Sequence, residues 1–259
     1  MADPRPCWPV LLCDIGNTHC DWALAGQAGW IARGRAPSER IVELFAQDWR
    51  RFDAPCRILA ANVAGSEAAQ ALAQGCRALW GRAPEFLRAP ARGLGVVNGY
   101  RQPGQLGIDR WLALVAAAGL GSEPACVVDC GSAITIDLLA TEGRHLGGVI
   151  LPGLAMMERA LRAGTRIPPY THRGASDLAA KDTGAAIHAG ALLAAAAAVE
   201  RATGELRLRV GARVRLMLTG GAAPQLFGSL REPFQYQPDL VLQGMLLYAS
   251  QAKPVEADS

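Results

Sequence analysis

One pattern occurs twice in this sequence, once in each half of the chain. Residues 10–18 read Val-Leu-Leu-Cys-Asp-Ile-Gly-Asn-Thr, and residues 125–133 read Ala-Cys-Val-Val-Asp-Cys-Gly-Ser-Ala. Each copy is an apolar run typical of a buried strand, followed by Asp-x-Gly, a small polar residue and a second strand. An aspartate also recurs downstream, Asp21 after seven residues and Asp137 after eight. This self-similarity predicts a duplicated domain.

The repeat divides the chain close to its middle. The two motif aspartates, Asp14 and Asp129, are 115 positions apart in a chain of 259 residues. We therefore predict two related halves, residues 1–120 and 121–259, with a boundary near residues 119–124. Coincidence is the alternative, because Asp-x-Gly at a strand end is a common turn. It explains the matched spacing less readily.

Strand and helix signals alternate along the whole chain, which predicts an α/β fold. Apolar runs bounded by glycine or aspartate indicate strands, and apolar positions three and four residues apart indicate helices. The expected strands are 10–13, 22–25, 30–33, 57–61, 125–128, 135–139, 148–151 and 214–218, and the expected helices begin at Ser38 and cover 66–80, 107–118, 154–163 and 183–201.

The basic residues exclude one class of nucleotide-binding protein. Only Lys181 and Lys253 are lysines among the 26 basic side chains, and neither follows a glycine-rich run. A phosphate-binding loop of the G-x-x-x-x-G-K-[ST] type is therefore absent, so any phosphate chemistry must proceed without its lysine. The formal net charge of +3 gives no case for a nucleic-acid partner.

The sequence favours a cytoplasmic protein without a membrane partner. The polar, proline-broken first residues and the short apolar run after them do not form a signal peptide. The longest apolar stretch, residues 184–199, is expected to be too short for a membrane span. Seven cysteines without a C-x-x-C pair predict buried, reduced thiols.

The two Asp-x-Gly motifs suit phosphate chemistry. A carboxylate at a strand end can hold Mg²⁺, directly or through water. The glycine lets backbone N–H groups turn toward an anion without a Cβ in the way. The structural alternative is a pair of tight turns with capping polar groups. Two copies at matching spacing favour a nucleotide phosphate site formed by the two halves.

A third segment, residues 98–110, reads Asn-Gly-Tyr-Arg-Gln-Pro-Gly-Gln-Leu-Gly-Ile-Asp-Arg. Asp109 and Arg110 stand at the start of a predicted helix, where a carboxylate is stabilised as the anion. Asp109 is thus a candidate base for a hydroxyl proton, and Arg110 can hold a carboxylate by a bidentate bond. The alternative is an N-terminal cap with a surface salt bridge.

Together these motifs resemble the type III pantothenate kinases. The resemblance covers nearly the whole chain and includes residues 14–18, 98–110 and 129–137. Residues 147–153, the pair Asp182–Thr183 with Gly190 downstream, and Thr219-Gly-Gly add to it. That family belongs to the acetate-kinase, sugar-kinase, Hsp70 and actin superfamily. The resemblance implies two ribonuclease-H-like halves with mixed sheets that face a central nucleotide cleft.

The resemblance also implies a reaction and a homodimeric enzyme. ATP with Mg²⁺ would phosphorylate the primary hydroxyl of pantothenate, the first step of coenzyme A biosynthesis, and a monovalent cation, K⁺ or NH₄⁺, would be required. Asp109 would be the general base, and Asp129 and Asp14 would hold the metal ions. Pantothenate would contact Tyr100, Gly107, Ile108, Asp109, Arg110 and Thr183, and the ATP phosphates would contact Asp14, Ile15, Gly16, Asn17, Thr18, His19, Cys20, Asp21 and Ser132.

One residue departs from the family pattern, and two other functions stay open. Ser132 stands where the family usually has threonine, so the hydroxyl is kept and a methyl group is lost. Cys130 beside it is interpreted as core packing. A phosphohydrolase of the same superfamily and a non-catalytic accessory or regulatory relative are the alternatives. The four histidines lack metal-site spacing, so we expect packed or surface side chains.

Overall fold

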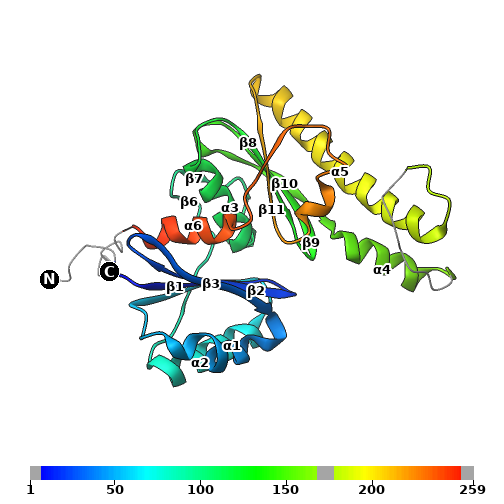
Figure 1. The fold of residues 1–259 in the computed structure, drawn as a ribbon. Coiled ribbons are helices and arrows are strands. Elements are labelled where there is room, and N and C mark those ends of the chain that lie inside the picture. Colours follow the sequence, from blue (N-terminus) through cyan, green and yellow to red (C-terminus); the bar gives the residue numbers. More distant parts are fainter. Residues whose placement is uncertain (1–6, 168–177, 252–259) are drawn as a thin grey trace. The chain divides into compact units, whose positions relative to one another are not determined.

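The computed structural model describes residues 7–167 and 178–251 (Figure 1). Contacts divide the chain into two compact units. The first unit lies within residues 1–94, 101–116 and 240–259, and the second within residues 95–100 and 117–239. The chain passes between the units more than once: its last helix belongs to the first unit, and the short segment 95–100 belongs to the second. The domain boundary at residues 120 and 121 stays a prediction.

The first unit contains a five-stranded mixed sheet. Its strand order is β3-β2-β1-β4-β5. The pairs β1–β2 and β2–β3 are antiparallel, whereas β1–β4 and β4–β5 are parallel. The strands are β1 Val10–Ile15, β2 His19–Gly26, β3 Gly29–Pro37, β4 Arg57–Asn62 and β5 Glu85–Phe86, and β6 Arg92–Gly93 lies outside this sheet.

Helices cover both faces of the first sheet: α1 and α2 lie on one side of it and α6 on the other (Figure 1). The left-handed Gly81 (φ +66°) ends α2, as expected for a glycine after a helix C-terminus. The helices are α1 Ile41–Gln47, α2 Ser66–Trp80, α3 Ile108–Gly119 and α6 Leu240–Ala249, with 3₁₀ turns at Ser38–Arg40, Trp49–Arg51 and Pro103–Gln105.

An aromatic cluster forms part of the core of the first unit. Trp49 is fully buried, and its ring lies 5.8 Å from Trp22, 4.8 Å from Phe45 and 6.1 Å from Trp80 between centroids. Edge-to-face and stacked pairs at these separations contribute beyond the area they bury. The first unit also contains every tryptophan of the chain, at positions 8, 22, 30, 49, 80 and 111.

The second unit contains a sheet of the same topology. Its strand order is β10-β9-β8-β11-β12, with β8–β9 and β9–β10 antiparallel and β8–β11 and β11–β12 parallel. The strands are β8 Ala125–Cys130, β9 Ala133–Leu139, β10 His145–Pro152, β11 Arg215–Thr219 and β12 Phe234–Tyr236, and β7 Val96–Val97 lies outside this sheet.

Mostly aliphatic side chains form the core of the second unit. The helix α5 packs against β8 and β9, and α4 packs against α5. Asp182 caps α5 because its carboxylate accepts a hydrogen bond from the backbone N–H of Ala185 at 2.8 Å. The helices are α4 Leu154–Gly164 and α5 Thr183–Val210, with 3₁₀ turns at Thr141–Gly143 and Ala223–Leu226.

The length of α5 corrects one sequence expectation. The stretch 184–199 is part of a 28-residue helix whose most apolar window has a mean hydropathy of 1.4. By length and composition, this helix meets the test for a membrane span. A core helix passes the same test, and 44% of the window is buried against the rest of the protein.

The shared topology confirms the α/β fold with two related halves, but it corrects one part of the repeat. Asp21 pairs directly with Asp14 across β1 and β2. The residue opposite Asp129 is Thr135, and Asp137 lies two positions further along β9. The two downstream aspartates are therefore not equivalent. Their similar spacing arises because the second turn is one residue shorter and its aspartate lies further along the strand.

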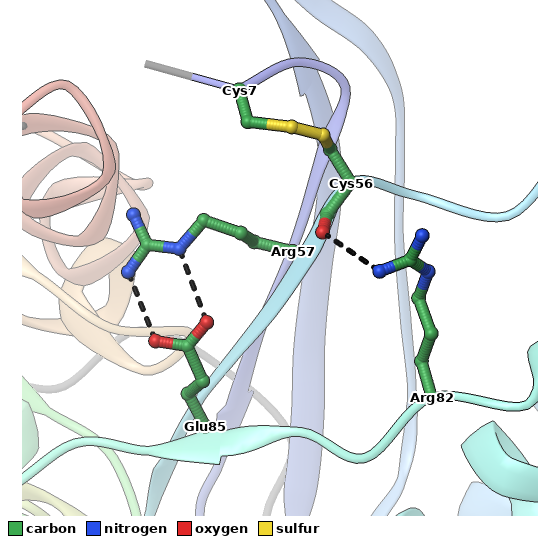
Figure 2. The surroundings of a disulfide bond; sticks show 5 residues. All are labelled: Cys7, Cys56, Arg57, Arg82 and Glu85. Atoms are coloured by element: carbon green, nitrogen blue, oxygen red, sulfur yellow. Dashed lines mark hydrogen bonds and ion pairs between the residues drawn. A yellow bond between two sulfur atoms is a disulfide. The ribbon is translucent and has the colours of Figure 1, made fainter. Parts of the chain in front are cut away.

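A disulfide corrects the prediction that all cysteines are reduced. Cys7 and Cys56 are bonded, with their Cα atoms 5.7 Å apart (Figure 2). The bond links the chain just before β1 to the residue before β4. Beside it, the Arg57 guanidinium donates two hydrogen bonds to the Glu85 carboxylate, at 3.1 and 3.0 Å. Cysteines 13, 20, 76, 126 and 130 are free and buried, as expected.

The structure confirms all the expected strands and helices and lengthens most of them. The helix predicted over residues 66–80 matches α2 at both ends. The segment predicted as one helix from Ser38 is α1 flanked by two 3₁₀ turns. The sequence reading missed the short strands β5, β6, β7 and β12, and it missed α6.

Candidate functional site

The first Asp-x-Gly turn joins β1 to β2. Its backbone is closed by a hydrogen bond from the Gly16 N–H to the His19 carbonyl at 2.9 Å. Ser38 holds the turn from outside, since its hydroxyl donates to the Gly16 carbonyl at 2.6 Å and its N–H donates to the Thr18 carbonyl at 3.0 Å. Asn17 and Thr18 are exposed at the tip. The turn thus presents polar groups to solvent from a fixed backbone.

The side chains of the segment 14–21 face in two directions. Ile15 and Cys20 are fully buried in the core, so only their backbone groups can reach a ligand. Burial, with the nearby charges of Asp14 and Asp21, raises the pKa of the Cys20 thiol. Asp14 and Asp21 are half-buried, and Asp21 forms an exposed ion pair with Arg35 at 3.5 Å.

Asp109 stands in the first turn of α3. Its Oδ1 accepts a hydrogen bond from the N–H of Arg110 at 2.8 Å. A Cβ on Gly107 would lie 2.5 Å from the same oxygen, so glycine leaves the space that the carboxylate occupies. Arg110 is only 6% exposed. This burial excludes the reading of Arg110 as part of a surface salt bridge.

The second Asp-x-Gly turn joins β8 to β9 and is more closely packed than the first. The Gly131 N–H donates to the Ala133 carbonyl at 2.9 Å, which repeats the closing bond of the first turn with one residue fewer. Gly153 donates to the Ser132 carbonyl at 3.0 Å, and a Cβ on Gly153 would lie 2.5 Å from that oxygen. The turn is therefore fixed by Gly153, the residue between β10 and α4.

Gly220 passes directly beside the Asp129 carboxylate. A Cβ at position 220 would lie 2.3 Å from Asp129 Oδ1 and 2.5 Å from the Cys130 carbonyl oxygen. Its φ of +87° also favours glycine. The bare Cα of Gly220 therefore lies between a carboxylate oxygen and a carbonyl oxygen, and Ser132 adds a hydroxyl to the same turn. Oxygen donors of this kind fit a hard cation such as K⁺ or Mg²⁺.

Cys130 belongs to the core, as expected. Its side chain is fully buried, and burial together with the charge of Asp129 raises the pKa of its thiol to about 12. The thiol stays protonated at neutral pH, so Cys130 is no candidate nucleophile or metal ligand.

Tyr100 belongs to the second unit, where its ring stacks on that of His145 with centroids 6.0 Å apart. His145 is 1% exposed, and its Nε2 lies 2.9 Å from Oδ1 of the buried Asp137. The sequence-based prediction did not include His145 or Asp137 among the site residues. An aspartate within an otherwise apolar strand was the available signal.

Thr183 is the first residue of α5 and lines a pocket of about 630 Å³ within the second unit. The pocket lies among α4, α5 and the end of β10, and its surface is mostly apolar. Thr183 is the polar side chain on this wall. The other lining residues are Pro152, Met157, Ala160, Leu161, Ala186, Ile187, Gly190 and Ala191.

The predicted site residues thus fall into two groups. The first unit holds residues 14–21 and 107–110, and the second holds Tyr100, Asp129, Ser132 and Thr183. Within the residues that the structure describes, no cluster of three or more histidine, cysteine, aspartate or glutamate side chains is arranged to hold a metal. A metal would therefore depend on one or two carboxylates and on other oxygen donors, as Mg²⁺ commonly does.

Sequence comparison supplies a family. Residues 10–205 match the model of the type III pantothenate kinase family. A type III pantothenate kinase from Nitrosococcus oceani is 39% identical and aligns over 96% of this chain and 97% of its own. The enzymes of the same name from Halorhodospira halophila and Aromatoleum aromaticum are 36% and 38% identical, with 91% and 93% of this chain covered and 96% and 97% of their own.

Solved structures support the fold. A candidate Baf-family transcriptional activator from Campylobacter jejuni has a TM-score of 0.57 at 24% identity, with 91% of this chain and 95% of that chain covered. A candidate 2-dehydro-3-deoxygalactonokinase from Sinorhizobium meliloti has a TM-score of 0.54 at 16% identity, with 93% and 97% covered. At these identities the likeness concerns the fold alone.

Proposed function

The chain belongs to the type III pantothenate kinase family, and from this premise we propose how its own residues carry out the reaction. The activity follows from the family: the protein is an enzyme that phosphorylates pantothenate in coenzyme A biosynthesis, and the reaction depends on ATP. What remains is the assignment of the base, the phosphate contacts, the cations and the substrate contacts.

Asp109 is the proposed general base. Its carboxylate is at the N-terminus of α3, where the helix dipole favours the anion. It would accept the proton of the primary hydroxyl of pantothenate while that oxygen bonds to the γ-phosphorus of ATP and the bond to the ADP oxygen breaks. The hydrogen bond from the Arg110 N–H fixes one carboxylate oxygen. This placement of Asp109 is the observation that carries the mechanism.

The two Asp-x-Gly turns are the proposed phosphate contacts. In the first turn, the exposed Asn17 and Thr18 and backbone N–H groups would bind phosphate oxygens, with Asp14 as the Mg²⁺ carboxylate. In the second, the Ser132 hydroxyl would make the phosphate contact. When bound, Mg²⁺ neutralises charge on the phosphates of ATP.

Asp129 is the proposed ligand of a monovalent cation, K⁺ or NH₄⁺. The support is local: Gly220, which has no Cβ, lies against the carboxylate, and the Cys130 carbonyl oxygen lies against the same Gly220. A bound cation would balance negative charge beside the phosphate-binding turn. The protein's part is to keep that turn rigid through Gly153.

Arg110 is the proposed partner of the pantothenate carboxylate, because a buried guanidinium binds a carboxylate with strong, charge-assisted hydrogen bonds. Tyr100, Gly107, Ile108 and Thr183 complete the proposed substrate contacts. We also propose a homodimer that covers the apolar surface around the pocket of Thr183. Leu161, which lines this pocket, is 43% accessible.

Release of ADP tests the proposal directly. We expect ADP only when pantothenate is present and K⁺ or NH₄⁺ replaces Na⁺. ADP release without pantothenate would indicate the phosphohydrolase alternative, and no release under any condition would indicate a non-catalytic relative. We place the enzyme in the cytoplasm without a nucleic-acid or membrane partner.

Asp109→Asn tests the base. The amide cannot accept the proton, so we expect turnover to fall by about 100-fold or more while pantothenate still binds. Binding is measured by calorimetry with pantothenate and a non-hydrolysable ATP analogue. Gln105→Asn, an exposed change in the preceding 3₁₀ turn, is the matched control. Turnover of Asp109→Asn equal to that of the wild type would remove Asp109 as the base.

A further inference from the structure

We propose that Asp137 and His145 are positioning residues for pantothenate, which set the backbone and ring of Tyr100 without touching substrate. The inference rests on the proposed contact between Tyr100 and pantothenate. It concerns the second unit alone, to which all three residues belong. Neither residue has another part in the mechanism above.

The segment before Tyr100, residues 95–99, runs alongside residues 143–145, which lead into β10. A Cβ on Gly143 would lie 1.7 Å from the Gly95 carbonyl oxygen, so the two backbones are in direct contact there. Val97 forms a parallel bridge with Arg144. Two residues further on, a Cβ on Gly99 would lie 2.0 Å from the His145 carbonyl oxygen. Tyr100 is thus placed by a backbone that lies against residues 143–145.

The His145 ring ties this contact to Asp137. Its Nδ1 accepts a hydrogen bond from the Gly99 N–H at 3.4 Å, so Nδ1 carries no proton. In the neutral ring the proton is then on Nε2, which donates to Asp137 Oδ1 at 2.9 Å. Asp137 therefore selects the tautomer that can hold Gly99. The opposite tautomer would place two N–H groups against each other.

The same ring supports the side chain of Tyr100. The two rings are nearly parallel, 15° apart, with centroids separated by 6.0 Å. The Tyr100 N–H donates to Asn98 Oδ1 at 3.0 Å, which closes a local turn immediately before the tyrosine. Backbone turn, ring stack and the Gly99 bond together restrict Tyr100 to one orientation.

Burial argues that this arrangement has a purpose beyond packing. Asp137 and His145 are 2% and 1% exposed, and burying such groups is costly unless they are fully hydrogen-bonded. The corresponding position of the first sheet, opposite Leu12, is the buried Ala23, so the fold does not need a polar pair there. A satisfied buried pair that only stabilises the unit is the competing explanation.

Steady-state kinetics of Asp137→Asn separate the two explanations. The amide can donate as well as accept, so it no longer selects the tautomer. We expect the KM for pantothenate to rise about tenfold through misplacement of Tyr100, whereas the KM for ATP and kcat change less than twofold. Thr203→Val is the matched control, because Thr203 is a fully buried polar residue of the same unit whose hydroxyl donates to the Val199 carbonyl at 2.8 Å and bonds with the Cys126 thiol, not with Tyr100 or His145.

A second readout does not depend on substrate. In ¹⁵N NMR spectra of the wild-type protein, His145 should show a protonated Nε2 and an unprotonated Nδ1, and Asp137→Asn should mix the two tautomers. If Asp137→Asn does not fold, His145→Gln, which keeps a donor for Asp137 but loses the ring and the acceptor for Gly99, takes its place with the same expected rise in KM.

The outcomes distinguish this inference from the proposed function. A protonated Nδ1 in the wild type would overturn the positioning role, as would equal changes in both KM values or a result matching Thr203→Val. Tyr100→Ala tests the premise separately. If that variant keeps the wild-type KM for pantothenate while the NMR pattern is as expected, the assignment of Tyr100 as a substrate contact fails instead.

Discussion

The two sheets have one topology but stabilise their turns differently. In the first sheet, the residue after the β4 partner of Asp14 is Asn62, whose side chain bonds to its own loop, to Ala64 N at 3.0 Å and to the Gly65 carbonyl at 2.8 Å. In the second sheet the same position is Gly220, which has no side chain and lies against Asp129. In the first turn a side chain therefore holds the neighbouring loop, whereas in the second the backbone of Gly220 lies against the aspartate itself.

The interiors differ as well. Aromatic rings around Trp49 fill part of the first core, and a disulfide joins the chain just before β1 to the residue before β4. The second core is mostly aliphatic and contains the buried Asp137–His145 pair. The two halves thus share one strand order, and each holds its turn by different contacts. Each of the following changes is directed at one of these differences.

The largest expected effect is on the aromatic core. Trp49→Ala should lower the free energy of unfolding by about 3–5 kcal/mol, because it removes a fully buried ring and leaves a cavity. Leu218→Ala in β11 is the counterpart in the second core, with an expected loss of about 2–5 kcal/mol. Urea unfolding followed by circular dichroism measures both. A loss below 1 kcal/mol for Trp49→Ala would show that the cluster is not a core.

Next is the disulfide, which only the first half has among the described residues. Cys7→Ser should cost about 2–4 kcal/mol, because the bond closes a long loop, with a sequence separation of 49. Reduced wild-type protein should lose the same amount, and a reductant should not affect the variant. Thermal unfolding with and without reductant checks this. If the wild type is insensitive to reductant, the bond does not form in solution.

Gly220→Ala tests the enclosed turn. We expect a loss of about 2 kcal/mol from crowding and the positive φ, and about 100-fold lower activity because Asp129 is displaced. Gly228→Ala is the matched control, since Gly228 is an exposed glycine of the same unit whose Cβ would meet nothing within 4 Å. Urea unfolding and the ADP-release assay give the two values. Equal effects of the two substitutions would show that the close approach of Gly220 to the Asp129 carboxylate does not matter.

The smallest effect concerns Cys130, which stands where the first half has Ile15. Burial raises the pKa of its thiol from 9.0 to about 12. Above pH 9 the unfolded chain loses this proton and the folded protein keeps it, so stability falls as pH rises, by about 1.4 kcal/mol per pH unit for one thiol. Cys130→Ala should reduce the slope by that amount between pH 9 and 11 in urea titrations. An unchanged slope would show that the folded thiol ionises normally.

Much of this structure follows from local sequence. The strands that end in Asp14 and Asp129 and the helix that begins before Asp109 are each marked by an apolar run and a boundary residue, so pattern alone places them. The helix α6 was not predicted because Leu240–Ala249 is apolar on nearly every side, and such a short run shows no clear periodicity.

The long-range contacts could not be predicted for a different reason. Cys7 and Cys56 meet only because β1 and β4 are parallel neighbours, and Asp137 meets His145 only through the irregular register of β9 and β10. No local pattern specifies either pairing. Gly220 could be expected as a turn residue, but its approach to Asp129 depends on how β8 and β11 align.

The distribution of tryptophan gives the protein an internal optical probe. Because all six indoles lie in the first unit, fluorescence excited at their red edge reports on that unit and leaves the second one dark. A change in emission without a change in far-ultraviolet circular dichroism would assign an event to the first unit. A change in circular dichroism without a change in emission would assign the event to the second unit. The two halves can therefore be told apart without attaching a dye.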